Sequence, residues 1–244
     1  MKFFRQILIL VLTATPSAQC WSQVYQSPCS LNSATHDVKY DAKALWTGIK
    51  HAPKAAIEPH NLAWELPIGA VTGVLIAEVD RPANDRIQSQ SLQSTASRWS
   101  NIGLAMELGS GAAAWGIGCG KGNSKTAEAG FAALTALGAA GAVDLVLKLS
   151  FNRQFPYTPG STGRFWGGGR SFPSGHSATS FAFASTIAHS YPHNRWIKWG
   201  AYAVATGVSL SRYPAKKHYW SDILAGATLG YVTGSYLADQ TFKP

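Results

Sequence analysis

Apolar stretches alternate with short polar connections along most of this 244-residue chain, from about Ala63 to its end. The apolar positions recur at helical spacing, and the period-two alternation typical of strands is nearly absent. Six stretches are predicted as helices: Leu66–Glu78, Asn101–Cys119, Thr126–Leu149, Ser174–Ser190, Arg195–Ser211 and Ser221–Asp239. The sequence therefore predicts an all-α domain over residues 62–244, with six helices in a bundle.

The first 61 residues follow a different pattern. Lys2 and Arg5 precede a short apolar run and then small residues, which is typical of an export signal over residues 1–20. Gln19 disrupts the small-residue cleavage pattern, so an uncleaved N-terminal anchor is the alternative. Residues 21–61 are polar and interrupted by prolines, which predicts an extended or loosely helical lead-in segment.

Composition indicates a protein with a large core and an anionic partner. Hydrophobic residues make up 46% of the chain, and the formal net charge is +9. Phosphate esters and anionic lipid headgroups suit this charge, whereas nucleic acid is not expected because the basic residues are scattered. A mean hydropathy of −0.03 is low for six membrane spans. We therefore expect an exported protein of the periplasm or cell envelope, soluble or attached to a membrane surface.

The three cysteines show no spacing typical of metal ligands. Cys20 and Cys29 can form a disulfide in an oxidising compartment, and unpaired thiols are the alternative. We expect no metal site and no cofactor.

One connection, Asn152–Phe172, is long for a loop within a helical bundle. It is rich in glycine, proline and arginine, and its Phe165-Trp166 pair gives it apolar surface to bury. The sequence therefore predicts an ordered loop with a functional role.

Three polar clusters fall at the ends of the predicted helices. Lys148 closes the third helix and Arg153 follows it. Pro173-Ser-Gly-His176 opens the fourth helix, and Ser211–Asp222 joins the fifth to the sixth. Each cluster alone has a structural explanation, such as a helix N-cap or an i,i+4 surface pair. Their combination is informative, because together they provide what transfer of a phosphoryl group requires.

In this interpretation each residue type has one task. Lys148, Arg153 and Arg212 supply positive charge, and the backbone at Ser174 and Gly175 offers N–H groups to an anion at a helix N-terminus. His218 can attack phosphorus as a neutral imidazole. The two remaining assignments concern protons: Asp222, one turn later, can fix the tautomer of His218, and His176 can protonate the leaving oxygen.

These motifs resemble a known family. Lys148…Pro156, Pro173-Ser-Gly-His176 and Ser211-Arg-x5-His218-x3-Asp222 are similar to the three-part signature of the type 2 phosphatidic acid phosphatase (PAP2)/vanadium haloperoxidase superfamily. The resemblance implies a six-helix bundle with its active site at the helix ends. It also implies a metal-independent phosphatase with His218 as nucleophile, His176 as general acid and Asp222 as orienting carboxylate. The implied phosphate ligands are Lys148, Ser174, Gly175 and Arg212.

The first motif departs from the family pattern at one position. Phe155 stands where the family usually has an arginine. Arg153, two residues earlier, is the candidate replacement, and Arg164 and Arg170 of the loop are the alternatives. Lipid phosphates and small phosphomonoesters are the expected substrates. Two alternatives stay open at this point. The first is a vanadium-dependent haloperoxidase, and the second is a non-enzymatic envelope protein with a vestigial anion pocket.

Overall fold

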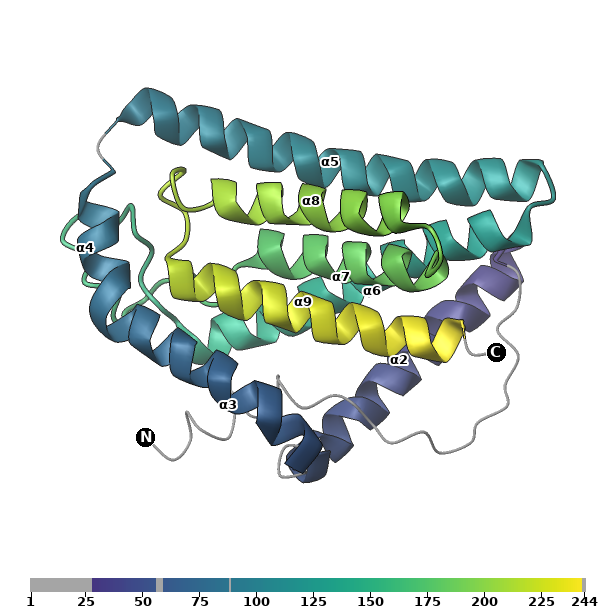
Figure 1. Ribbon diagram of the computed structural model, residues 1–244, viewed down its shortest axis with the longest axis horizontal. Helices are drawn as coiled ribbons and strands as arrows, with labels where there is room; N and C mark the ends of the chain where they lie inside the picture. The colour runs from purple at the N-terminus through teal and green to yellow at the C-terminus, as the bar shows by residue number, and fades with distance from the viewer. Residues whose placement is uncertain (1–27, 56–58, 88, 243–244) are drawn as a thin grey trace.

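The computed structural model describes residues 28–55, 59–87 and 89–242, and every regular element within these ranges is a helix (Figure 1). The all-α class predicted from the sequence is therefore confirmed. The elements are α2 (Leu31–Ala55), α3 (Pro59–Val74), a π-helical segment (Leu75–Val79), α4 (Asp80–Asp85), α5 (Gln90–Gly120), α6 (Ser124–Phe151), α7 (Gly175–Ser190), α8 (Arg195–Ser211) and α9 (Trp220–Thr241).

Helices α5 to α9 lie side by side along the long axis of the molecule, and α2 and α3 slope across one side of them (Figure 1). The bounds of α6 to α9 agree with the predicted ones to within two residues. Asn123, Ser174 and Asn194 cap α6, α7 and α8 by accepting hydrogen bonds from free backbone N–H groups of the first turn. These local signals explain why the starts of these three helices can be predicted from the sequence.

The predicted lead-in segment contains a regular 25-residue helix, α2. Its inward side carries Asp37 and Asp41 as well as alanines, and the Thr135 hydroxyl donates to Asp41 at 2.8 Å. Because buried carboxylates stand where apolar residues are expected, the amphipathic pattern is hidden in the sequence. The predicted export signal, residues 1–20, lies outside the described residues.

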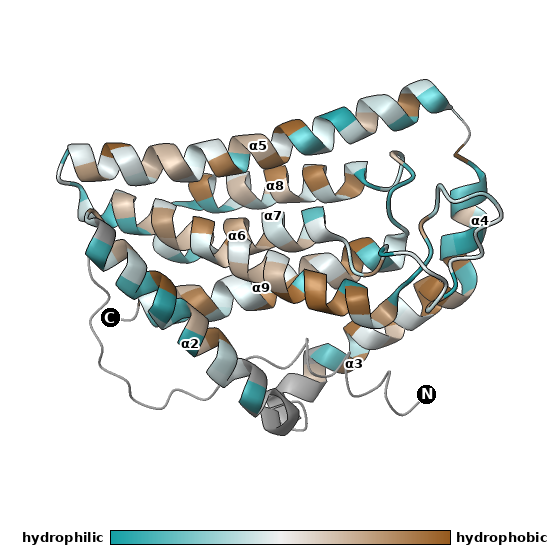
Figure 2. Ribbon diagram, turned by 180° about the vertical axis from the view of Figure 1, so that it is seen from behind, coloured by the Kyte–Doolittle hydropathy of each residue, from teal (hydrophilic) through white to brown (hydrophobic). Residues whose placement is uncertain are grey.

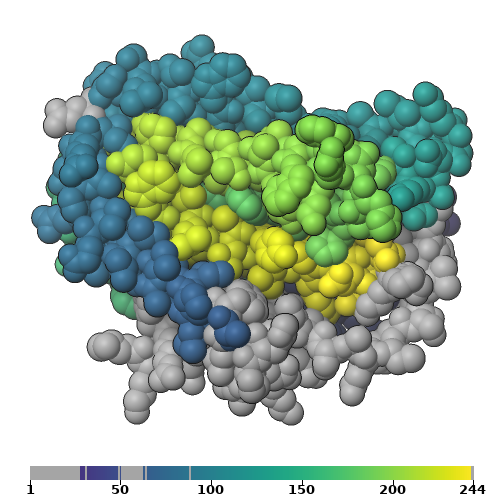
Figure 3. All heavy atoms as spheres, viewed as in Figure 1, coloured from purple at the N-terminus to yellow at the C-terminus, as the bar shows by residue number. Residues whose placement is uncertain are grey.

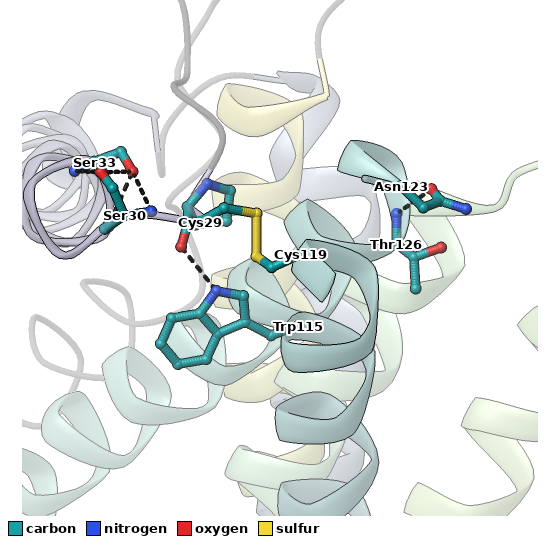
Figure 4. The surroundings of a disulfide bond; sticks show 8 residues. Cys29, Ser30, Ser33, Trp115, Cys119, Asn123 and Thr126 are labelled. Carbon is teal, nitrogen blue, oxygen red and sulfur yellow. Dashed lines mark hydrogen bonds between the residues drawn. A yellow bond between two sulfur atoms is a disulfide. The ribbon is translucent and has the colours of Figure 1, made fainter. Parts of the chain in front are cut away.

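A disulfide joins the start of α2 to the end of α5. Cys29 pairs with Cys119, 90 residues away, and the Trp115 indole donates to the carbonyl of Pro28 beside it at 2.8 Å (Figure 4). The suggested Cys20–Cys29 pair is therefore wrong, because Cys29 is committed to a partner on another helix. The bridge fixes the N-terminal helix to the bundle.

Helices α7 and α9 run parallel in very close contact. Gly226, Gly230 and Gly234 lie one turn apart on α9 and face the backbone of α7, where a Cβ at Gly230 would collide with the carbonyl of Ala178. Glycine spacing of this kind lets two helix backbones approach closely. The contact brings the N-terminal ends of α7 and α9 to the same end of the bundle.

The loop between α6 and α7 is anchored to the core. The Phe165 and Phe172 rings pack edge-on against Phe151, with ring centroids 5.9 and 5.1 Å apart, and Ser171 donates its N–H to the Arg153 carbonyl. Of the Phe165-Trp166 pair that was predicted to be buried, only Phe165 packs against the core. Trp166 is 63% exposed, and its indole donates to the Ser150 carbonyl.

Among the described helices, α6 is long and apolar enough to cross a membrane by length and composition. Within its most apolar window, 44% of the residues are buried by the rest of the protein. A central helix of a bundle passes the same test, so this observation alone is weak support for a membrane span.

Candidate active site

The three sequence clusters meet at one end of the bundle, where α6 and α8 end and α7 and α9 begin (Figure 1). Lys148 lies in the last turn of α6, His176 in the first turn of α7, and Arg212 directly after α8. The backbone N–H of Ser174 donates to the carbonyl of Asp222 at 2.9 Å, which fixes the second cluster to the third.

His218 is buried beneath this end of the bundle and has a defined tautomer. Its Nδ1 lies 2.8 Å from the carbonyl oxygen of Ser171 and 3.6 Å from the Asp222 carboxylate. A carbonyl only accepts hydrogen bonds, so Nδ1 carries the proton and Nε2 keeps its lone pair. Burial lowers the pKa of His218 to about 4, with Lys148 and Arg212 adding to the effect against Asp222. The ring is therefore neutral at pH 7.

Asp222 is fully buried and heavily hydrogen-bonded. Its oxygens accept from the Ser171 hydroxyl, from the backbone N–H of Tyr219 at 2.9 Å and from Arg153 Nη1 at 2.5 Å. Burial opposes ionisation, but the adjacent Arg153 and His218 bring the pKa of Asp222 below its usual value. The hydrogen bond of His218 Nδ1 is therefore made to the Ser171 carbonyl. Asp222 acts on the His218 ring chiefly through its negative charge.

The structure places Arg153 behind Asp222 rather than among the phosphate-facing cations. Its side chain is about 1% exposed and donates to Asp222, Asp80 and Ser221, while Nε donates to the Gly163 carbonyl. The guanidinium also lies between the rings of Phe165 and Tyr219. All three nitrogens of its guanidinium therefore have partners within the protein. Arg153 does not take the place of the arginine that the family usually has at position 155.

His176 contacts helix α5 through its ring. Its Nε2 lies 3.0 Å from the side-chain oxygen of Asn101 on α5. Burial, together with the nearby Arg212, His218 and Lys148, lowers the pKa of His176 to about 3. A negative ligand among these groups would reverse that electrostatic effect and raise the pKa of His176.

Two cations flank the histidines. Lys148 Nζ lies 3.2 Å from Asp144 and also donates to the Pro173 carbonyl. Arg212 Nη1 donates to Ser100 at 2.7 Å, whereas its buried Nε has no hydrogen-bond partner. A buried N–H of a guanidinium without a partner is costly, and an anion in the site would supply one.

Ser174 and Gly175 form the N-terminal end of α7 as predicted. The buried Ser174 hydroxyl accepts from the N–H and the hydroxyl of Ser177, so its side chain serves the helix as a cap. Gly175 is packed against Asp144, whose Oδ2 would lie 2.9 Å from any added Cβ. A side chain at this position would require Asp144 to shift, whereas glycine leaves the backbone N–H groups of this end uncovered by a Cβ of its own.

Phe155 turns its ring toward the nucleophile position. Its centroid lies 6.3 Å from that of His218, and it stacks on Tyr157 at 5.0 Å. Together with Arg170 and the glycines 167–169, these two rings line an open cavity of about 330 Å³ beside the site. The position of the missing arginine is thus occupied by an aromatic wall.

Several residues of the site were not identified from the sequence. Asp80 and Asn101 come from α4 and α5, far from the motifs, and contact the site through hydrogen bonds that only the fold creates. Ser171 lies just before the second cluster and contacts both His218 and Asp222. No local pattern marks them. Within the described residues, no group of three or more His, Cys, Asp or Glu side chains is arranged to hold a metal ion.

Comparisons with known proteins point to one family. The model of the PAP2 superfamily matches residues 129–243. A lipid A 1-phosphatase from Porphyromonas gingivalis is 35% identical over 77 residues, which is 30% of this chain and only 17% of that protein. The crystal structure of a transmembrane PAP2-type phosphatidylglycerolphosphate phosphatase from Bacillus subtilis aligns with a TM-score of 0.45 and 18% identity, over 84% of this chain and 93% of that chain.

Proposed function

We propose that the protein is a phosphatase of the PAP2 superfamily, whose model matches residues 129–243, and that it hydrolyses phosphate monoesters through a phosphohistidine on His218. One observation carries the proposal. The Nδ1–H of His218 donates to the Ser171 carbonyl, so Nε2 holds an unshared electron pair beside the cations Lys148 and Arg212. A neutral imidazole held among cations is suited to attack on a phosphate ester.

The first chemical step forms the phosphohistidine. Nε2 of His218 attacks phosphorus, the bond from phosphorus to the leaving oxygen breaks, and that oxygen takes a proton from His176. The developing positive charge on the His218 ring is balanced by Asp222, 3.6 Å from Nδ1. The proposed ligands of the phosphoryl oxygens are Lys148, Arg212 and the backbone N–H groups at Ser174 and Gly175.

The second step regenerates the enzyme. His176, now neutral, accepts a proton from a water molecule that attacks phosphorus, and the phosphorus–nitrogen bond breaks. The products are inorganic phosphate and neutral His218, with the His176 proton restored. Because cations of the chain surround the reacting group, we propose that hydrolysis requires no added metal ion.

We propose a phosphorylated lipid or a small phosphomonoester as the substrate. The similarity to a lipid A 1-phosphatase supports a lipid phosphate, and so does the exposed apolar surface of α5 and α8. We also propose that the protein is exported and attached to a membrane. The Cys29–Cys119 disulfide supports an oxidising compartment, such as the periplasm.

A metal-free activity screen of the full-length protein tests this function. Phosphatidic acid, a prenyl diphosphate and p-nitrophenyl phosphate would be supplied with EDTA, and we expect phosphate release that vanadate blocks. His218→Ala should lower kcat by about 10³-fold or more, because the covalent route is lost. The control is His193→Gln, an exposed histidine at the other end of the bundle. Turnover by His218→Ala at the rate of this control would refute the mechanism.

A further inference from the structure

A second buried carboxylate lies behind the one that faces His218. Asp80, at the start of α4, is about 2% exposed and accepts from Arg153 Nη2 at 2.9 Å. It also accepts from the backbone N–H of Ser221 at 3.1 Å and from the Ser221 hydroxyl. Asp80 therefore caps α9 from a distant segment, 141 residues earlier in the chain.

Arg153 connects the two carboxylates. Its Nη1 donates to Asp222 at 2.5 Å and to Ser221 at 2.7 Å, while Nη2 donates to Asp80. The result is a buried row of three charges, Asp80, Arg153 and Asp222, that ends at His218. Its geometry is fixed from three segments: α4, the loop after α6, and α9.

The net charge of this row determines how strongly a positive charge on the His218 ring is stabilised. An arginine paired with Asp222 alone would cancel the negative charge needed beside a phosphorylated imidazole. With Asp80 included, the row keeps one net negative charge while Arg153 still holds the Asp222 carboxylate in place. Asp80 lies outside the family-matched segment, and no motif of the sequence marks it.

We propose that Asp80 and Arg153 are a positioning pair, which fixes Asp222 and preserves its negative charge at His218. Neither side chain contacts the substrate in this proposal. The inference rests on the proposed function for its catalytic consequence, whereas its electrostatic consequence at His218 can be measured without turnover. Other charged or titratable groups also face His218 and must stay unchanged in the comparison: Lys148 of α6, His176 of α7 and Arg212 after α8.

The test compares Asp80→Asn with the double variant Asp80→Asn/Arg153→Gln in the full-length protein. The single variant leaves the row with no net charge, so the protonated form of His218 loses stabilisation and its pKa falls. The double variant leaves Asp222 alone, which restores one net negative charge and returns the pKa toward the wild-type value. An NMR titration of the His218 ring measures these three pKa values directly. The result does not depend on whether the protein is a phosphatase, because no turnover is required.

Activity gives the second readout. We expect Asp80→Asn to lower kcat by tenfold or more while KM changes less than twofold, because phosphate ligands are untouched. The matched control is Asp85→Asn, the same change on an exposed position of the same helix. If Asp80→Asn does not fold, the double variant, in which Asp222 keeps its hydrogen bonds from the Ser171 hydroxyl and the Tyr219 N–H, still reports on the pair. An unchanged His218 titration in both variants, or kinetics of Asp80→Asn equal to those of Asp85→Asn, would overturn the proposal.

Discussion

The two histidines of the site are both neutral at pH 7 when no ligand is bound. The mechanism, however, requires one neutral and one protonated histidine. Burial and surrounding cations lower the pKa of His218 to about 4 and that of His176 to about 3. A nucleophile must be neutral, so His218 is ready. A general acid must carry a proton, so His176 has to gain one when the substrate arrives.

Phosphate binding should therefore depend on pH through one proton. Above about pH 7.5, most of the free inorganic phosphate, whose second ionisation lies near pH 7, and His176 have lost the proton that the complex contains. The complex then holds one proton more than its separated parts, so the Kd for inorganic phosphate should rise about tenfold per pH unit. Below about pH 6 free phosphate carries that proton itself, and the Kd should level off. Calorimetric titration from pH 5.5 to 8.5 measures this slope.

The control for this prediction removes only the proton acceptor. In His176→Gln the slope above pH 7 should become much shallower, whereas His193→Gln, at an exposed position, should behave as the wild type does. Equal slopes in His176→Gln and the wild type would show that the proton is held elsewhere.

At the scale of elements, the contact between α7 and α9 places the chemistry. His176 and Asp222 sit in the first turns of these helices, which approach closely because Gly226, Gly230 and Gly234 present no side chains to α7. Any atom added along this seam must separate the helices or tilt one of them, because the opposing atoms belong to backbone.

Gly230→Ala should destabilise the protein, although alanine is the better helix former. Its Cβ would collide with the Ala178 carbonyl, and overpacking of this kind costs about 1–3 kcal/mol. Gly138→Ala, on an exposed position of α6 with open space around it, should be neutral or stabilising by up to about 1 kcal/mol. Thermal unfolding of both variants tests this prediction. A Gly230→Ala protein as stable as Gly138→Ala would show that α7 and α9 are not packed tightly enough to exclude a Cβ.

The sequence was sufficient for those elements whose signals are local. Helices α6 to α8 begin at capping residues, all four helices from α6 to α9 contain apolar runs, and the motifs at their ends mark His176, His218 and Asp222. Contacts between distant segments were not readable. Asp80 is indistinguishable in sequence from a surface aspartate, and Arg153 was expected at the phosphate because only the fold shows its partners. The regular helix α2 escaped detection because its buried side includes aspartates.

For the whole molecule, the exposed surface of α5 beyond its first turns is unusual in being nearly free of charge. Between Trp99 and Gly120, α5 contains one charged residue, Glu107, and this side chain points inward to the Ser180 hydroxyl at 2.7 Å. The polar residues of α5 are concentrated in its first turns near α4 (Figure 2). Large apolar side chains project outward instead, namely Trp99, Ile102, Met106, Leu108 and Ile117.

Helix α8 continues this surface. Its outer side lies uncovered next to α5 (Figure 3), and Trp196 and Trp199 are 77% and 66% exposed. Arg195 and Lys198 lie over these two indole rings, at 5.3 and 5.9 Å from the centroids. Indoles beside cations are typical of the interface between a membrane and water, and a chain of net charge +9 is attracted to anionic lipid.

The attachment proposed for this surface predicts how the protein separates when cells are fractionated. It should sediment with membranes and resist release by 1 M salt, because buried indoles are not screened as surface charges are. The double variant Trp196→Ser/Trp199→Ser should shift to the soluble fraction. Each indole contributes about 2 kcal/mol of burial, so losing two should weaken membrane partitioning by well over about tenfold.

Trp46→Ser is the matched control, since Trp46 is an exposed tryptophan on α2, away from this surface, and should leave sedimentation unchanged. A wild-type protein that is soluble at low salt would contradict the attachment. Loss of sedimentation in Trp46→Ser equal to that in the double variant would instead show that α8 is not the contacting surface. Because the active site lies at the end where α8 finishes, attachment along this helix would hold the site near lipid headgroups, where a phosphorylated lipid presents its phosphate.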